Sequence, residues 1–321
     1  MISRRLLRIK ALTALYALNR REDNDLVRAE TELMFSIDKT YDLYHYLLLL
    51  VLEIADIASE KIDFGLQKKM PSPEDLSPRT RFVDNRVIAQ LRMNSDLRDY
   101  LDNKKLSWVN FQHIPRQLFV RMTSWGVYDE YMNNQNENFI SDKKFIIKLI
   151  TELFLNSEEL GSCLEEQSIY WNDDLEYVSA MLEKTLKKFK ADSGENVPLM
   201  PLFKNEEDRE FVKLLFRKAV MKADTYSELI DKNTTNWEVE RIALMDILVM
   251  RLALTEIIEF PEIPVKVTLN EYIEIAKYYC TSKSSNFVNG ILDNIVKEIR
   301  EKGLFNKFGR GLVGESITDE D

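Results

Sequence analysis

The residues best suited to chemistry in this sequence include three arginines in the opening segment, Arg4, Arg5 and Arg8. At about 100° of turn per helical residue, their side chains fall within a sector roughly 100° wide. A compact basic patch of this kind can position phosphate groups, although it is more often only a solvated helix face. The net charge of −10 opposes unspecific nucleic-acid binding, so any RNA contact must depend on such a local patch.

A second candidate lies near the end of the chain, at Phe287. Ser284 and Ser285 precede it and could cap a helix, which would place free backbone N–H groups and a positive dipole end beside the ring. That combination suits a phosphate with a stacked base. A hydrophobic contact that fixes the start of the helix explains the same spacing more simply. Gly290, within the same helix, would allow another backbone or a ligand to approach closely.

A lone acid, Asp246, stands in an apolar helical run. The residues that share its face are apolar, and no basic residue at helical spacing neutralises it. Those neighbours are Ile242, Ala243, Val249 and Met250. Asp246 therefore either meets a partner inside the fold or faces another protein.

No catalytic or metal-binding arrangement is predicted. The chain has two histidines and two cysteines, none of them at the spacing of metal ligands or a redox pair. It has no phosphate-binding glycine loop, and its adjacent acidic pairs, such as Glu158 and Glu159, diverge on a helix. We therefore expect a protein that is not an enzyme and uses no cofactor.

The location of the protein is predicted from the same features. Reduced thiols fit a cytoplasmic protein, and no apolar run approaches the ~20 residues of a membrane span. The first 20 residues are rich in arginine and free of acids, a composition that also fits a mitochondrial transit peptide. The basic patch of a first helix explains this composition better, so we expect a cytoplasmic protein.

The segments that must position these residues have helical periodicity. With 9 glycines, 8 prolines and 45% hydrophobic residues in 321, the composition favours a mainly helical protein. We expect helices over residues 3–18, 26–35 and 37–68, a loop at 71–80, shorter helices over 82–133, and three helical runs between 237 and 296. The core face of the first helix is predicted to hold Leu7, Ala11, Ala14, Leu15 and Leu18.

A segment in the middle of the chain is similar in sequence to a segment in the C-terminal third. The segment D-K-K-F-I-I-K-L-I from Asp142 resembles D-R-E-F-V-K-L-L-F from Asp208, 66 residues later, and each is followed after 29 residues by a tryptophan. A duplicated helical hairpin would explain this spacing, although the few matched positions could also arise by chance.

Three strings in the C-terminal third resemble the family of the bacterial transcription antitermination protein NusB. They read W-x-V-E-R-I-A-x-x-D-x-x-x-x-R-L-A-x-x-E-I, then I-P-x-K-V-x-x-N-E-x-I-E-x-A-K, then F-V-N-G-I-L-D. The matched positions are Trp237, Arg241, Asp246, Arg251, Glu256, Pro264, Asn270, Glu271, Ala276, Phe287, Asn289, Gly290 and Asp293. The opening R-R-L-L-R-I-K-A-L-T-A-L-Y is similar to the family's first helix; Arg4, Arg5, Arg8, Ala11, Leu15 and Tyr16 agree, and Leu7, Ile9 and Thr13 depart.

The resemblance implies an all-α fold: NusB-like helical bundles, here enlarged by an additional helical region. We expect an N-terminal helical region at 1–200, made of the first NusB-like helix and a long helical insertion. A NusB-like C-terminal bundle would follow at 201–303, and a disordered tail at 304–321. The sequence does not indicate what the insertion, at about 70–200, does.

The resemblance also implies a function. Such a protein would bind boxA-like single-stranded RNA of ribosomal RNA leaders together with NusE, a small-subunit ribosomal protein, within the transcription elongation complex. Arg4, Arg5 and Arg8 would contact phosphates, Phe287 would stack on a base, and Lys266 and Asn289 would add polar contacts. Tyr16 and Asp246 fall where the family contacts NusE. We expect the arginines and Phe287 to lie on one surface.

Two features qualify this expectation. Before the phenylalanine the family often has E-D-S-x-K-F, whereas this chain has S-K-S-S-N-F, so Lys283 replaces an acid and Asn286 replaces a base. The first change favours RNA affinity and the second opposes it. The net charge of −10 and the long insertion instead favour a competing hypothesis, a helical protein-interaction scaffold that binds no RNA.

Overall fold

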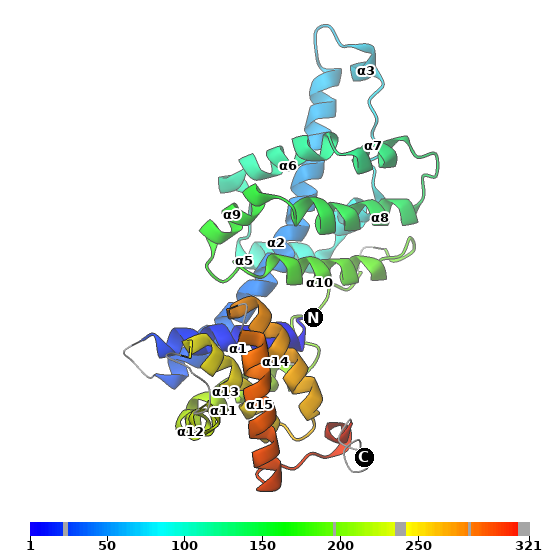
Figure 1. The fold of residues 1–321 in the computed structure, drawn as a ribbon. Helices are drawn as coiled ribbons and strands as arrows, with labels where there is room; N and C mark the ends of the chain where they lie inside the picture. Colours follow the sequence, from blue (N-terminus) through cyan, green and yellow to red (C-terminus); the bar gives the residue numbers. More distant parts are fainter. Residues whose placement is uncertain (22–24, 195–196, 235–241, 282–283, 314–321) are drawn as a thin grey trace. The chain divides into compact units, whose positions relative to one another are not determined.

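The computed structural model describes residues 1–21, 25–194, 197–234, 242–281 and 284–313. Within these ranges the regular elements are all helices, which confirms the predicted all-α class (Figure 1). The chain forms two compact units. Unit 1 comprises Met1 and Asp38–Leu202, and unit 2 comprises Ile2–Ile37 with the chain from Phe203 onward. The units differ from the predicted domains in grouping the first helix with the C-terminal bundle, and the predicted domain boundaries remain a prediction.

Unit 2 is built around one buried helix, α13 (Leu244–Glu259). Helices α1 (Arg4–Asn19), α11 (Glu206–Met221), α12 (Ala223–Thr234), α14 (Val265–Tyr279) and α15 (Ser284–Glu301) all pack against it. Helix α13 has to be apolar on nearly all sides because its neighbours cover it from every direction. The predicted start of this run, with Trp237 and Arg241, lies outside the described residues.

The outer helices of unit 2 bury the stripes that their sequences predict. On α1, Leu7, Ala11, Leu15 and Leu18 are buried, whereas Ala14 is half-exposed. Ser3 caps this helix by accepting a hydrogen bond from the backbone N–H of Leu6. On α15 the whole predicted stripe is buried: Val288, Ile291, Leu292, Ile295 and Ile299.

Part of the tail expected to be disordered has defined contacts in unit 2. The 3-10 turn η3 (Gly309–Leu312) lies against the turn after α13. The Phe308 backbone N–H donates to the Pro261 carbonyl at 3.2 Å, and the Lys307 ammonium donates to the Phe260 carbonyl at 2.9 Å. A side chain at Gly311 would meet the Pro261 oxygen at 2.0 Å, so this approach requires glycine. Residues 314–321 lie outside the described residues.

Unit 1 begins within the long helix α2 (Leu26–Leu66). This is one helix where two were predicted. The backbone continues through Ser36, whose hydroxyl donates to the Leu33 carbonyl of the same helix. The loop predicted at 71–80 contains the short helix α3 (Pro73–Leu76), which Ser72 and Asp75 cap reciprocally.

The remainder of unit 1 is a set of shorter helices, drawn in cyan and green in Figure 1. In chain order they are α4 (Arg86–Met93), α5 (Ser95–Lys104), η1 (Val109–Phe111), α6 (His113–Thr123), α7 (Gly126–Asn133), α8 (Phe139–Lys148), the π-helical segment η2 (Leu149–Phe154), α9 (Glu158–Gln167) and α10 (Leu175–Lys188).

The structure supports the predicted internal repeat and extends it from a hairpin to three helices. With the shift of 66 residues read from the sequence, α8 with η2 corresponds to α11, α9 to α12, and α10 to α13. Six buried positions of α8–η2 and α11 coincide: Asp142 with Asp208, Phe145 with Phe211, Ile146 with Val212, Leu149 with Leu215, Ile150 with Phe216, and Leu153 with Ala219. A buried stripe at this spacing is common to amphipathic helices, so the stronger support is that three consecutive helices coincide under one shift of 66 residues.

Candidate nucleic-acid interface

The arginines of α1 connect it to three different helices of unit 2. Arg4 Nε donates to Asp208 of α11 at 2.8 Å. The Arg5 guanidinium makes two bonds, of 2.8 and 2.9 Å, to Glu271 of α14. The Arg8 guanidinium makes two bonds of 2.7 Å to Glu256 of α13. The basic patch expected from the sequence therefore exists, but each of its cations already has a carboxylate.

Arg8 belongs to a buried polar network. Its side chain is 4% exposed and that of Glu256 is 0% exposed, and Glu256 also accepts bonds from the Thr268 hydroxyl at 2.9 Å and the Tyr272 hydroxyl at 3.3 Å. Burial acts to lower the pKa of Arg8, but the hydrogen bonds and charge of Glu256 outweigh it and raise that pKa above the ordinary value. Its position therefore gives no support to the phosphate contact predicted for Arg8.

Arg4 and Arg5 differ from Arg8 in their exposure. Their side chains are 37% and 41% exposed, so part of each guanidinium can reach a ligand without leaving its carboxylate. The hydrogen bond from Arg5 holds the pKa of Glu271 below its usual range. An acid that stays ionised keeps the arginine fixed in one orientation. These two arginines can therefore present positive charge at a defined place on α1.

A second group of candidate residues lies along α14 and α15. Lys266 of α14 is exposed and lines a concavity of about 230 Å³ together with Asp293. Asn289 of α15 donates to Asp293 at 3.3 Å. Lys266 and Asn289 are therefore grouped around one aspartate, and Lys297 and Arg300 line the same concavity.

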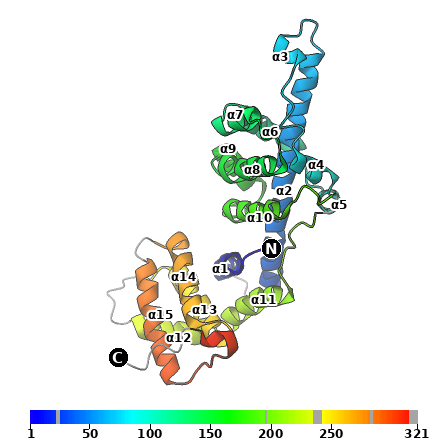
Figure 2. The same cartoon turned by 90° about the vertical axis from the view of Figure 1, so that its right-hand side faces the viewer.

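Phe287 is half-exposed on the first turns of α15. Figure 2 shows α14 lying between α1 and α15 in this unit. Arg5 reaches α14 through Glu271, while α15 packs along α14. That Arg5 and Phe287 share one surface remains a prediction. The hydroxyl of Ser284, predicted to cap α15, instead accepts from the Thr281 backbone N–H at 3.1 Å and donates to Asp246.

The position of Asp246 supports the first of the two alternatives that the sequence left open. This residue is 6% exposed, and its Oδ2 accepts from the Ser284 hydroxyl at 3.0 Å, so it has a partner inside the fold. Its Oδ1 is buried with no hydrogen-bond partner among the described residues. Burial, followed by the Asp246 carboxylate, raises the pKa of the neighbouring Cys280 thiol. Tyr16 is half-exposed on α1, with the Arg20 guanidinium 5.3 Å from its ring centre.

No role was predicted from the sequence for the three acids that bind these arginines. Asp208, Glu256 and Glu271 orient Arg4, Arg8 and Arg5, respectively. One available signal was Glu256 itself, which is a further acid in the largely apolar run that holds Asp246 and, once buried there, needs a cation. Its partner is 248 residues away in the sequence, so spacing could not identify it.

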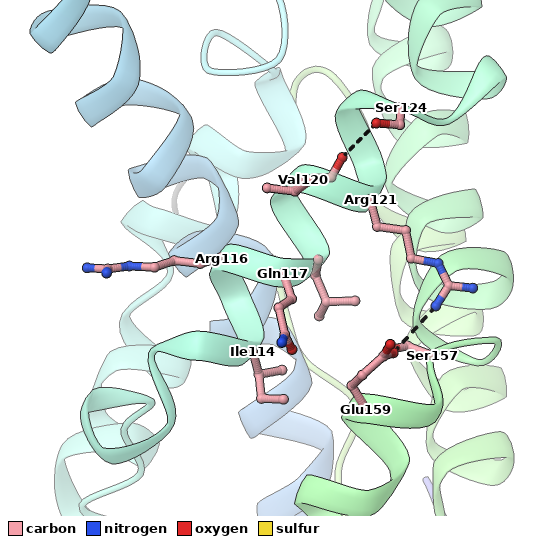
Figure 3. Close-up of a pocket in the computed structure, with 9 residues that line it drawn as sticks. Ile114, Arg116, Gln117, Val120, Arg121, Ser124, Ser157 and Glu159 are labelled. Atoms are coloured by element: carbon pink, nitrogen blue, oxygen red, sulfur yellow. Dashed lines mark hydrogen bonds and ion pairs between the residues drawn. The ribbon is translucent and has the colours of Figure 1, made fainter.

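Unit 1 has a further concavity, of about 420 Å³, between α6 and the start of α9 (Figure 3). Arg121 closes one side of it by donating to the Asn156 carbonyl at 2.7 Å, and it lies 3.7 Å from Glu159. The charged residues among those described as lining it are Arg116, Arg121 and Glu159. Opposite charges paired in this way leave little net field for an ionic ligand.

Among the titratable groups outside these sites, His45 is held by contacts inside unit 1. His45 is buried, donates from Nδ1 to the Tyr41 carbonyl at 2.8 Å, and stacks on Tyr100. Burial lowers the pKa of His45 to about 4. In the described ranges, no group of three or more His, Cys, Asp or Glu residues is arranged to hold a metal ion. None of the helices described there is both long enough and apolar enough to cross a bilayer.

Comparisons with known proteins add a separate line of evidence. Residues 186–297 match the NusB family. The transcription antitermination protein NusB of Salinibacter ruber is 41% identical over 121 residues, which cover 38% of this chain and 76% of that protein. The NusB protein of Chloroherpeton thalassium is 42% identical over 105 residues (33% and 50%), and that of Alkaliphilus oremlandii is 37% identical over 93 residues (29% and 67%). No solved structure matches the chain.

Proposed function

Because this chain belongs to the NusB family, we propose that it is a transcription antitermination factor that binds boxA-like single-stranded RNA together with NusE. The observation that carries the proposal is the similarity of this chain to proteins named for antitermination, together with the family match of residues 186–297. The chain is a long form, in which most of unit 1 lies outside the residues that match the family. The proposal includes no catalytic step and no cofactor.

Arg4 and Arg5 supply the phosphate contacts in this proposal. Both are partly exposed and both are held in place by a carboxylate, so they meet a phosphate with little further loss of side-chain freedom. Arg8 has a different role here: it fixes the angle of α1 through Glu256 and thereby positions the other two arginines.

The remaining RNA contacts come from α14 and α15. Phe287 provides a stacking face worth ~1–3 kcal/mol per base, and Lys266 and Asn289 add polar contacts beside it. Asn286, which replaces the family's base, is exposed. Lys283 lies outside the described residues.

For NusE, the proposal assigns Tyr16 and Asp246 to the contact surface. The support for Asp246 is its unsatisfied Oδ1, because a buried carboxylate oxygen without a donor is costly and a donor from a partner would remove that cost. The complex of protein, NusE and RNA would then act on the transcription elongation complex.

The test is a titration of a labelled boxA-like RNA, with and without NusE, at several salt concentrations. The double variant Arg4→Gln, Arg5→Gln should weaken binding and reduce the slope of log K against log[salt] by about 1.4, which is about 0.7 for each lost phosphate contact. Arg209→Gln is a matched control, since Arg209 is 47% exposed and also lies near a glutamate, Glu206, at 3.6 Å.

The result decides between the two functions proposed from the sequence. Equal affinities and slopes for wild type, the double variant and the control would refute the role of α1 in RNA binding. Binding of NusE without any RNA binding would favour the helical scaffold.

A further inference from the structure

A polar concavity of about 270 Å³ in unit 1 collects three arginines. Arg79 and Arg81 come from the segment before α4, and Arg86 is the first residue of α4. The opposite side is formed by the end of α7, the segment after it and the start of α8. The other residues described as lining it are Thr80, Asp84, Met132, Glu137 and Asp142.

The hydrogen-bond partners of these arginines are mostly neutral. Arg79 donates to the Asn133 side-chain oxygen at 3.1 Å. Arg81 donates to the carbonyls of Asn134 and Asn136 and, at 2.8 Å, to the hydroxyl of Ser141. A carbonyl or hydroxyl oxygen orients a guanidinium without cancelling its charge.

Arg86 is the member of the cluster with a carboxylate nearby. Its Nη2 donates to the Glu137 carbonyl at 3.4 Å, and its Nε lies 4.0 Å from Asp142 Oδ2. The Asp142 carboxylate also binds another group, because its Oδ1 accepts a hydrogen bond from the Tyr131 hydroxyl at 2.9 Å. In the described chain, Asp84 and Glu137 form no ion pair with the three arginines, although both line the concavity.

The contrast with α1 is the central observation. There, each arginine has a carboxylate oxygen within 2.8 Å. Here Asp142 lies 4.0 Å from Arg86, and within the described residues Arg79 and Arg81 donate to neutral oxygens, although Asp84 and Glu137 also line the concavity. Arg81 is also fixed in place, with its guanidinium 4.4 Å from the ring centre of Tyr131, and its Nε is buried without an acceptor. The concavity thus holds preorganised positive charge that an anion would match.

The internal repeat gives this corner an equivalent in unit 2. Helix α4 packs on α8 as α1 packs on α11. Arg86 begins α4 and lies near Asp142, just as Arg4 begins α1 and pairs with Asp208. The arrangement in unit 1 differs from the one around Arg4 in two ways. It has two further arginines, Arg79 and Arg81, and its carboxylate, Asp142, lies 4.0 Å from the arginine instead of 2.8 Å.

We propose that the Arg79–Arg81–Arg86 concavity of unit 1 is a second phosphate-binding site, which takes backbone phosphates of single-stranded RNA. The choice of RNA as the source of the phosphate rests on the proposed function. Arginine forks match phosphate oxygens in pairs, and three guanidiniums around one concavity suit a polymer whose charges are regularly spaced. The site gives unit 1 a role in holding RNA.

The experiment uses the full chain and a boxA-like RNA extended by uridines. The double variant Arg79→Gln, Arg86→Gln changes two exposed arginines and leaves the half-buried Arg81 in place. Its matched control is Arg98→Gln, Arg116→Gln, which removes the same charge from two exposed arginines of unit 1 that do not line this concavity. Tryptophan fluorescence of each variant establishes that unit 1 is folded.

The concavity variant should weaken RNA binding and reduce the salt slope by about 1.4, for two lost phosphate contacts, while the control keeps the wild-type slope. The same difference should appear in an Arg5→Gln background, which separates this site from that of α1. If Arg5→Gln alone has no effect while the concavity variant does, the proposed role of α1 fails and this inference stands. Equal slopes for the concavity variant and its control would overturn it.

Discussion

At the scale of single residues, Arg5 and Arg8 lie close together on α1 but differ in the exposure of their side chains. Arg5 and Arg8 both pair with a glutamate through two bonds, yet one side chain is 41% exposed and the other 4%. An exposed pair contributes little to stability because water screens it. A buried pair is costly to break, since the remaining charge has no compensation. Exposure therefore separates a possible ligand contact from a structural one.

This difference predicts opposite outcomes for two similar substitutions. Arg8→Gln should lower the free energy of unfolding by about 3–5 kcal/mol, because it leaves the Glu256 charge buried and unpaired. Arg5→Gln should change it by less than about 1 kcal/mol and weaken RNA binding instead. Urea unfolding and RNA titration of both variants are the measurements. A stable Arg8→Gln protein with weakened RNA binding would show that Arg8 is a phosphate contact after all.

Asp246 predicts a separable effect on the protein partner. Asp246→Asn keeps an acceptor for Ser284 but removes the charge, so we expect weaker NusE binding with a melting temperature within a few degrees of wild type. Ser284→Ala is the complementary variant, which removes the internal donor at 3.0 Å and keeps the charge. Isothermal titration with NusE and thermal melts distinguish the two. A large drop in melting temperature for Asp246→Asn, with unchanged NusE binding, would make the acid purely structural.

At the scale of elements, a close contact between two backbone segments fixes a turn that no sequence pattern indicates. The turn at η3 is held because Gly311 lets its backbone approach the Pro261 carbonyl. The composition of this tail suggested disorder, and a specific contact decided otherwise. Helix α2 also differs from its prediction, since it continues through the break predicted at residue 36.

Gly311→Ala tests the contact at η3. A Cβ there would lie 2.0 Å from the Pro261 oxygen, so the segment after α15 must move, at a cost of about 1–3 kcal/mol. We expect faster proteolytic cleavage between α15 and residue 313. Gly161→Ala is the control, since nothing lies within 4 Å of the added atom. Unchanged cleavage in Gly311→Ala would mean that the contact does not hold the segment.

At the scale of the whole molecule, the chain carries two units with related cores and different surroundings. The burial pattern of α8–η2 recurs in α11, but unit 2 adds α14 and α15 beside the repeated helices, and unit 1 adds α5, α6 and α7. The repeated helices supply the carboxylate of each pair, Asp142 on α8 and Asp208 on α11. The arginines come from helices outside the repeat, Arg86 from α4 and Arg4 from α1.

The two units should respond differently to pH. His45 is buried in unit 1, and its pKa falls from 6.5 to about 4 in the folded protein, so between these values the unfolded state binds more protons. Stability of unit 1 should therefore fall as pH decreases through this window, by about 2 kcal/mol between about pH 7 and about pH 5. Tryptophan fluorescence reports on unit 1 through Trp108, Trp125 and Trp171. His45→Phe, which keeps the ring stacked on Tyr100, should remove this pH dependence; if it persists, another group causes it.

The sequence by itself determined the helical class, the family and most of the core stripes of α1 and α15, because these depend on periodicity and spacing within one segment. It suggested the repeat, which the coinciding helix bounds then supported. Only the tertiary structure decided what each charged residue can do. The carboxylates that hold Arg4, Arg5 and Arg8 lie 204, 266 and 248 residues away. In the unit 1 concavity, Arg79 and Arg81 donate to neutral oxygens, which do not compensate their charge. Charge compensation depends on distance in space and on burial, and spacing along the chain specifies neither for residues so far apart.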